Sequence, residues 1–331
     1  MTNPVTSPKP EPMRIGEPGD LIELIPFLLG FHPADSVVIV GLAGTRLGPV
    51  ARVDLEVLGC LEVGQLVTPL QRSGCTTAVV VVYSTAPDGS GVLPGDAEVV
   101  ALSRACEDSG ITVSWAYLVH GNRFWSFTDL GGTASVLPGD TSPVAATAIS
   151  QGLSVVPRRD DLLAVFAPRP VEAQVHADTM AQEAYSLREV PMGAEDVDEA
   201  CKLILDTART LIEARAVTDL PVERLAVLGA LLDRIPVRDA VWLAVDAGEA
   251  DGLALWQQLF TRLPAPWSAP ALFLYGWEQF RSGNATMASE ACDRARAAAP
   301  DYSAARLLSD AISVSVNPVG MPLLRELAAA E

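Results

Sequence analysis

Hydrophobic and polar positions in the first half of the chain alternate in a way that predicts strands separated by helices. Residues 36–42 (SVVIVGL) and 76–84 (TTAVVVVYS) are apolar on both faces, which is typical of central strands. Residues 49–57 alternate between apolar and polar positions, which predicts a half-buried strand joined to the first by a hairpin. Residues 111–128 predict a further hairpin that turns at residues 120–122. The pattern therefore predicts a mixed sheet of about five strands flanked by helices.

A short helix is expected before the first strand. Residues 21–29 (LIELIPFLL) are almost entirely apolar, and Asp20 with Glu23 fits a capping box at the helix start. Gly30 is expected to end this helix, because glycine readily adopts the left-handed conformation of a helix C-cap. Pro26 lies about one turn inside the segment and predicts a kink or an irregular helix start there.

The second half of the chain has the period of helices throughout. The change of character falls near APRPVEA (167–173), where prolines mark a linker. We therefore expect a disordered tail over residues 1–13, a mixed α/β domain over 14–168 and an α-helical domain over 169–331. The expected helices of this second domain span residues 172–188, 195–215, 221–234, 236–247, 250–262, 268–282, 285–299 and 302–315.

Composition limits the classes of partner. The chain has 331 residues, 49% of them hydrophobic, with 23 basic against 41 acidic residues and a formal net charge of −18. Such a chain has enough apolar material for two cores. An acidic surface repels phosphate backbones, so we expect no nucleic-acid binding. No apolar run approaches the roughly 18 residues that a membrane span requires, so no membrane partner is expected.

The cysteines favour a cytoplasmic location. The sequence has five of them, at scattered positions without a CxxC pair or histidines at ligand spacing. This odd, dispersed set argues against a disulfide framework and against a zinc site. The acidic run at 195–199 (EDVDE) fits the first turn of a helix, where carboxylates complement the helix dipole. We therefore assign no metal and no cofactor.

A repeat-like helical hairpin is expected near the end of the chain. If Pro300 ends the second helix, the small and turn residues that tetratricopeptide helices place at their contacts and turn fall at Gly276, Gly283, Asn284, Ala288 and Ala295. Leu272 and Cys292 depart from that pattern. The pair therefore resembles a tetratricopeptide unit, although an ordinary helical hairpin also explains its small residues. Stacked arrays of this type present a surface to a peptide or another protein.

Polar residues between the first helix and the first strand are the main candidates for chemistry. His32, Asp35 and Ser36 do not converge easily into a catalytic triad, because they lie within five positions of each other and the chain has no G-x-S-x-G elbow. Their structural interpretation is a turn, with Asp35 bonded to backbone N–H groups and His32 to a carbonyl. Arg52 and Asp54 share a strand face and could flank a substrate anion or form an ion pair. If His32, Asp35, Arg52 and Asp54 converge, they predict a polar pocket.

Three segments together resemble a known family. These are LLGFHPADSVVIVGL (28–42), ARVDL (51–55) and GLSVVPRRDDLLAVFAP (152–168), and they are similar to the actinobacterial family named domain of unknown function 4192. The C-terminal helices carry a further pattern of that family, at Trp277, Gly283, Asn284, Ala288, Pro300, Tyr302 and Ala305. Here Arg158 stands where the family has a serine cap. The resemblance implies a host group and no activity.

The sequence favours a cytoplasmic protein that binds another protein or peptide through its C-terminal helices, and it favours a binding protein over an enzyme. The alternative is a small-molecule enzyme or ligand sensor with a polar cleft near His32, Asp35, Arg52 and Asp54. A structural component of a larger assembly is a third interpretation. The sequence does not identify the partner, the substrate or the oligomeric state.

Overall fold

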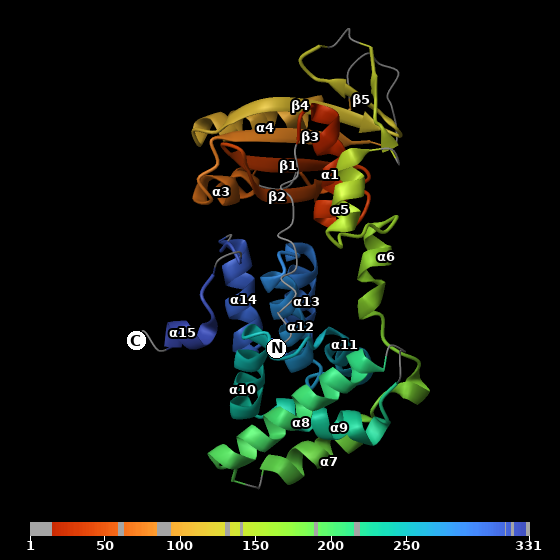
Figure 1. The fold of residues 1–331 in the computed structure, drawn as a ribbon, viewed down its shortest axis with the longest axis vertical. Helices are drawn as coiled ribbons and strands as arrows, with labels where there is room; N and C mark the ends of the chain where they lie inside the picture. Colours follow the sequence, from red (N-terminus) through yellow and green to blue (C-terminus); the bar gives the residue numbers. More distant parts are fainter. Residues whose placement is uncertain are drawn as a thin grey trace, which may run out of the picture. The chain divides into compact units, whose positions relative to one another are not determined.

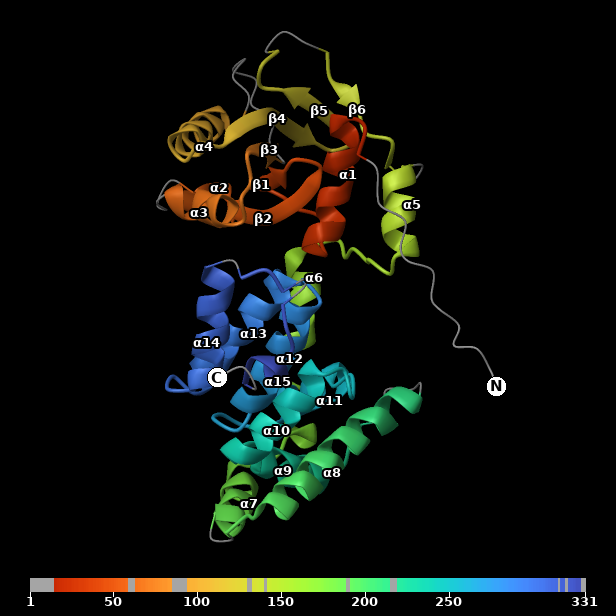
Figure 2. The same ribbon diagram turned by 60° about the vertical axis from the view of Figure 1, so that its left-hand side comes forward.

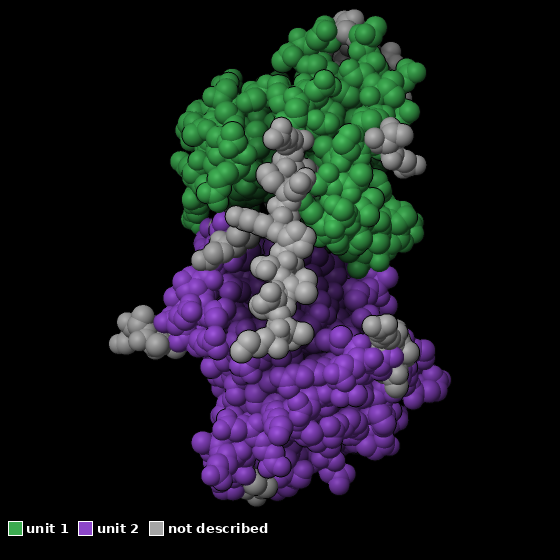
Figure 3. Space-filling model, viewed as in Figure 1, with its two compact units in different colours: residues 1–162 green, residues 163–331 purple. Residues whose placement is uncertain are grey.

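The structure is a computed structural model that describes residues 15–58, 63–84, 94–129, 133–139, 142–188, 191–214, 219–314, 316–318 and 321–328. The predicted tail over 1–13 and most of the predicted loop over 85–96 lie outside the described residues. The chain divides into two compact units, residues 1–162 and residues 163–331 (Figure 3). A mixed sheet with helices occupies the first unit and helices occupy the second, so the predicted fold class is confirmed.

The first unit is built on a six-stranded sheet (Figure 1). Its strands are β1 (Ser36–Ala43), β2 (Arg46–Asp54), β3 (Thr77–Tyr83), β4 (Thr112–His120), β5 (Arg123–Ser126) and β6 (Ser135–Val136). They lie in the order β2-β1-β3-β4-β5-β6, and every neighbouring pair is antiparallel except β3 with β4. The strand beyond the predicted five is β6, a two-residue strand at the edge.

Helices cover both faces of this sheet. The helices up to the division between the units are α1 (Pro18–Leu29), α2 (Leu55–Leu58), α3 (Gly64–Arg72), α4 (Asp96–Asp108), α5 (Pro143–Ser150) and α6 (Arg159–Leu163), which ends one residue beyond that division. α1 packs on one face, whereas α3 and α4 pack on the other (Figures 1 and 2). α5 packs against α1 through Val144 and Ala148. The strands β1 and β3 are therefore covered on both faces, which explains why their residues are apolar at successive positions.

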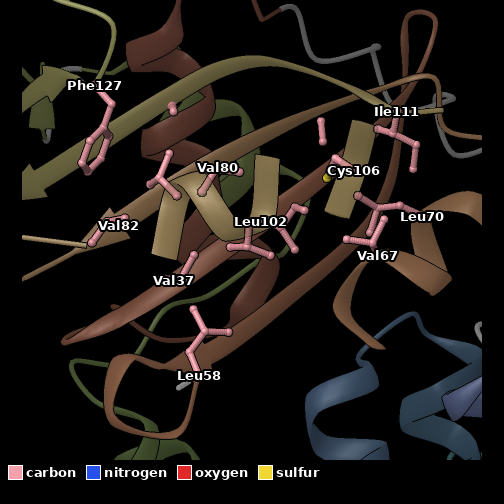
Figure 4. Packing of buried hydrophobic residues seen from close by; sticks show 14 of the residues in the cluster. Val37, Leu58, Val67, Leu70, Val80, Val82, Leu102, Cys106, Ile111 and Phe127 are labelled. Carbon is pink, nitrogen blue, oxygen red and sulfur yellow. The ribbon is translucent and has the colours of Figure 1, made fainter. Parts of the chain in front are cut away.

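Alternate residues of the central strands supply the two cores. Val37, Val80 and Val82 lie with Leu70 of α3 and Leu102 of α4 in one cluster (Figure 4). These side chains are almost completely buried. Each contributes roughly 1.5–3 kcal/mol when it leaves water, so this cluster is a main source of stability for the first unit.

The opposite face of the sheet packs against α1. Val38 and Val81 point to this face together with Phe31, and they meet Ile22 and Ile25 of the helix. Because side chains alternate across a strand, Val37 and Val38 enter different clusters although they are neighbours in sequence.

The boundaries of two predicted elements differ from the sequence prediction. α1 begins at Pro18, and its capping box joins Glu17 with Asp20 rather than Asp20 with Glu23. Pro18 explains the earlier start, because proline suits the first helical position. Gly30 ends the helix at φ 81°, as predicted. β2 ends at Asp54, so residues 55–57 form part of the short helix α2 rather than of the strand.

The second unit consists of helices joined by short connections. They are α7 (Ala177–Arg188), α8 (Ala194–Glu213), α9 (Val222–Leu232), α10 (Ile235–Asp246), α11 (Leu253–Arg262), α12 (Ala269–Arg281), α13 (Ala285–Ala298), α14 (Ser303–Ser313) and α15 (Leu324–Ala328), preceded by the 3₁₀ turns η2 (Ala164–Phe166) and η3 (Val171–Ala173). The cysteines among the described residues, Cys75, Cys106, Cys201 and Cys292, are free thiols.

The division into units falls after Leu162, whereas the sequence places the change of character after residue 168. The reason lies in the contacts of residues 163–175. Phe166 packs its ring 5.3 Å from Phe260 and 5.6 Å from Tyr275, measured between centroids. The buried Arg262 donates to the carbonyl of Ala173 at 2.6 Å. These contacts attach the connecting segment to the helical unit.

The helices α12 and α13 form an antiparallel pair with a close contact. A Cβ built on Gly276 would lie 3.2 Å from the Cβ of Ala291 and 3.4 Å from the carbonyl oxygen of Ala288, so only a small residue permits this approach. Gly283 makes the turn at φ 84°, and the side chain of Asn284 caps α13 by accepting the N–H of Met287 at 3.3 Å. The hairpin thus has the small-residue contact that the sequence predicts at these positions.

The close contact between β1 and β2 generates a test of the first unit. We expect Gly48→Ala to lower the free energy of unfolding by about 1–3 kcal/mol. A Cβ at this position would lie 2.5 Å from Cys75 Sγ and 3.1 Å from the carbonyl oxygen of Gly41, so neighbouring atoms must move. Urea denaturation followed by circular dichroism measures the change.

The matched control is Gly64→Ala. A Cβ on Gly64 meets no atom within 4 Å, and the residue begins α3, where alanine is the better helix former. This variant should be as stable as the wild type or more stable. Equal stability of the two variants would contradict the packing described for Gly48.

Candidate functional site

The structure brings two of the four predicted site residues together directly. On β2, Arg52 Nη2 lies 2.6 Å from Asp54 Oδ1, and the same nitrogen donates to the carbonyl of Ala34 at 3.2 Å. The Arg52 guanidinium also lies over the ring of Phe31, with 5.7 Å between Cζ and the ring centroid. We call Phe31, Ala34, Arg52 and Asp54 the Arg52 clasp.

His32 and Asp35 lie in the segment that the clasp holds. His32 is exposed, and its backbone N–H, rather than its imidazole, donates to a carbonyl, that of Val156 at 3.2 Å. Asp35 adopts φ 42°, a left-handed conformation that aspartate tolerates better than most residues, and its carbonyl accepts the N–H of Leu55 at 2.9 Å. Both residues therefore take part in the turn between α1 and β1 through their main chain.

The clasp joins segments that are distant in sequence. Phe31 forms a parallel bridge with Val156, and the N–H of Val156 donates to the carbonyl of Gly30 at 2.9 Å. Arg52 lies on β2, and its guanidinium forms an ion pair with Asp54 and a hydrogen bond with the main-chain carbonyl of Ala34. Two buried polar atoms beside this arrangement, Arg52 Nε and Ser36 Oγ, have no hydrogen-bond partner within the described ranges. The geometry supports a structural role for Arg52.

A cavity of about 400 Å³ lies elsewhere in the first unit, beside the start of α1. Its lining includes the edge-to-face ring pair Tyr117 and Phe124, with centroids 5.5 Å apart, and the carboxylates Glu17, Asp20 and Asp129. His32, Asp35, Arg52 and Asp54 do not line it. Asp20 already accepts the N–H groups of Gly16 and Glu17. Because the described lining contains no histidine or cysteine, it offers binding groups rather than a nucleophile paired with an imidazole base.

The second unit contains a buried carboxyl group that the sequence analysis did not single out. Glu278 of α12 accepts the indole N–H of Trp256 at 2.5 Å and the backbone N–H of Gly252 at 3.1 Å, both from the start of α11. Burial raises the pKa of Glu278 to about 7, and these hydrogen bonds and the nearby Asp251 modify that pKa less. Gly252 admits no side chain, because a Cβ there would lie 2.2 Å from the indole.

A second buried carboxylate lies at the end of α10. Asp246 Oδ1 accepts the indole N–H of Trp277 at 3.2 Å and lies 3.1 Å from Arg281 Nε. Its other oxygen, Oδ2, accepts the backbone N–H of Leu324 at 2.6 Å. Arg281 Nη1 donates to the carbonyl of Met321 at 3.2 Å. We call Asp246, Trp277 and Arg281 the Asp246 clamp, and its geometry binds the main chain of residues 321–324.

Part of the clamp could be predicted from the spacing of its residues in the sequence. Trp277 and Arg281 are four residues apart on α12, so their side chains share one helix face. Asp246 follows the apolar residues of α10 and is buried, with 1% of its side chain exposed. A carboxylate at the end of an apolar helix predicts a specific partner, but the sequence does not identify that partner as Arg281.

The described residues were also compared with the requirements of a metal site and of a membrane-spanning helix. In the ranges that the structure describes, no group of three or more His, Cys, Asp or Glu side chains is arranged to hold a metal ion. Within the same ranges, no helix combines the length and the apolar character that a bilayer span requires.

Comparison with known proteins gives one match. The sequence model of the family described as Domain of unknown function (DUF4192) matches residues 18–319. A search of curated proteins and a search of solved structures found no match. The match covers the clasp, the cavity lining except Glu17, Glu278 and the three side chains of the clamp.

The contribution of the Arg52 clasp to stability can be tested by mutation. We expect Arg52→Ala to lower the free energy of unfolding of the first unit by about 1–3 kcal/mol, because it removes the bonds to Ala34 and Asp54 and the contact with Phe31. Chemical denaturation measures the loss. Arg46→Ala is the control on the same strand; its side chain is exposed, so the change should stay within about 0.5 kcal/mol. A neutral Arg52→Ala variant would show that the clasp does not stabilise the fold.

Glu278 gives a second test, through pH. The folded protein holds a proton on Glu278 up to about pH 7, whereas the unfolded chain releases it near the ordinary value of 4.5. The contribution of this group to the free energy of unfolding therefore falls as pH rises from about 4.5 to 7, by on the order of 2–3 kcal/mol. Glu278→Gln keeps an oxygen acceptor for Trp256 and cannot ionise.

The stability of Glu278→Gln relative to wild type should therefore increase between pH 5 and pH 7. Denaturation of both proteins at matched pH values measures this difference, in which the contributions of the other carboxylates cancel. A difference that does not change with pH would mean that Glu278 keeps an ordinary pKa.

Proposed function

We propose that this chain, which belongs to the DUF4192 family, acts by binding another protein through the helices of residues 163–331. The proposal includes a cytoplasmic location in an actinobacterial host, and the free thiols of the described cysteines agree with a reducing compartment. The observation that carries the proposal is the Asp246 clamp, because it binds a chain segment through that segment's main-chain groups.

Main-chain recognition supports a binding role for this face. A group that accepts a backbone N–H and a group that donates to a backbone carbonyl can hold any sequence that presents the same geometry. The clamp has both groups on neighbouring helices, α10 and α12. It is therefore equipped to hold a polypeptide.

The arrangement of the helices supports the same role. α12 packs against α10 through the rings of Trp242 and Phe273, and towards α14 through Phe273 and Tyr302. Together with the close α12–α13 contact at Gly276, this side-by-side packing resembles tetratricopeptide helices, which present a surface to peptides.

Two exposed apolar side chains lie on α10, four residues before and four residues after Asp239, and we call this pair the apolar stripe. Ile235 and Leu243 have 62% and 40% of their surface exposed, and their spacing of eight residues places them on one helix face. Leu243 lies about one turn before Asp246. We propose that a bound protein continues from the clamp along this stripe.

The small-molecule alternative near His32, Asp35, Arg52 and Asp54 has less support. The Arg52 guanidinium is already bound to Asp54 and to the carbonyl of Ala34, and these four side chains do not line the cavity beside α1. A substrate anion would have to displace the Asp54 carboxylate from Arg52 before it could bind there.

Affinity purification of the full chain from its native host tests the proposal. We expect the wild type to recover a stoichiometric protein partner and Leu243→Asp to lose it, because the change puts a charge into the apolar stripe. Ile212→Asp is the matched control, since Ile212 is exposed to a similar extent, 47%, and belongs to a different helix, α8. Equal recovery by both variants would exclude the α10 face, and recovery of no partner by the wild type would contradict the proposed function.

A further inference from the structure

We propose that the segment Met321–Ala328 is a built-in ligand of the Asp246 clamp, and that the partner protein presents a segment of the same chemistry and must displace it. The inference rests on the proposed function and names the site, the class of partner and its regulation. That class is a short leucine-rich helix preceded by a proline, as in MPLLRELA.

The contacts of the segment are those of a bound peptide. Leu324 is the first residue of α15, and its N–H, which has no acceptor within its own helix, donates to Asp246 Oδ2 at 2.6 Å. Three residues earlier, the carbonyl of Met321 accepts from Arg281 at 3.2 Å. The clamp thus holds one donor and one acceptor at the point where the segment enters a helix.

The clamp is ordered by the helices rather than by the segment. Asp246 is buried and is fixed by Trp277 and Arg281, both from α12. A buried carboxylate oxygen that lost its donor would be costly to leave unpaired, so the site requires a chain segment or water at this position. A partner helix that offers an unpaired N–H in its first turn satisfies the same requirement.

The segment itself is held weakly enough to exchange. Leu323 and Leu324 are only partly buried, and Leu327 has 43% of its surface exposed. The N–H of Leu323 is satisfied within the segment, by Glu326 Oε2 at 3.1 Å. A five-residue helix has little stability of its own in water. The ring contacts that join α10, α12 and Tyr302 at the start of α14 do not involve this segment.

A peptide titration with purified full-length proteins tests this inference. The probe is a fluorescent synthetic peptide with the sequence of residues 316–331, and the variant is Leu324→Pro. Proline suits the first helical position but has no N–H, so the change removes the bond to Asp246 while α15 can still form. Arg325→Ala is the control in the same helix, because Arg325 is exposed. Fluorescence anisotropy measures the affinity.

We expect the peptide to bind Leu324→Pro at least about tenfold more tightly than it binds the wild type or Arg325→Ala. In those two proteins the tethered segment competes at an effective concentration on the order of millimolar. A peptide that itself carries the Leu324→Pro change should bind none of the three proteins.

Equal affinity for wild type and Leu324→Pro, or no binding to either, would overturn the inference. A wild-type dimer that Leu324→Pro converts to a monomer would also overturn it, and would assign the clamp to the segment of a second copy. The titration uses purified components, so its failure is distinct from a failure to recover a partner from the host.

Discussion

The contact of the Arg52 guanidinium with the ring of Phe31 helps to join three segments of the first unit that are distant in sequence. The guanidinium comes from β2, the ring from the turn after α1, and the bridge partner Val156 from the segment before α6. The ion pair with Asp54 and the bond to Ala34 hold the guanidinium in place. These three segments are also those whose sequence resembles the DUF4192 family. The three segments contact one another, so a substitution at Phe31 or Arg52 removes a contact between two of them.

Sequence periodicity predicted the sheet well and the element ends less well. The strands at 36–42 and 76–84 were predictable because both of their faces are buried, so their side chains are apolar at every position. The start of α1 was not, because Asp20 can complete a capping box with Glu17 or with Glu23, and the choice depends on Pro18 entering the helix. The end of β2 was missed because Leu55 is as apolar in the helix α2 as it would be in a strand.

The candidate site residues also differ in whether the sequence predicts their partners. The pairing of Arg52 with Asp54 could be predicted, since residues two apart on a strand share a face. The roles of Asp246, Arg281 and Glu278 could not, because their partners lie on other helices, and helix packing is not encoded in any local pattern. The clamp becomes visible only when α10, α12 and residues 321–324 are placed together. This geometry holds the main chain of residues 321–324 in the helical unit, whereas Arg52 and Asp54 bind each other in the first unit.

The contact between Trp256 and Glu278 gives the molecule an optical property. The emission of a buried indole depends on the charge beside its pyrrole nitrogen, and here that neighbour is a carboxyl group that ionises at about pH 7. Trp256 is completely buried, so solvent contributes little to its emission. The chain has six tryptophans, so the pH-dependent part of its emission that Glu278→Gln removes reports the ionisation of Glu278 beside Trp256, without any added dye.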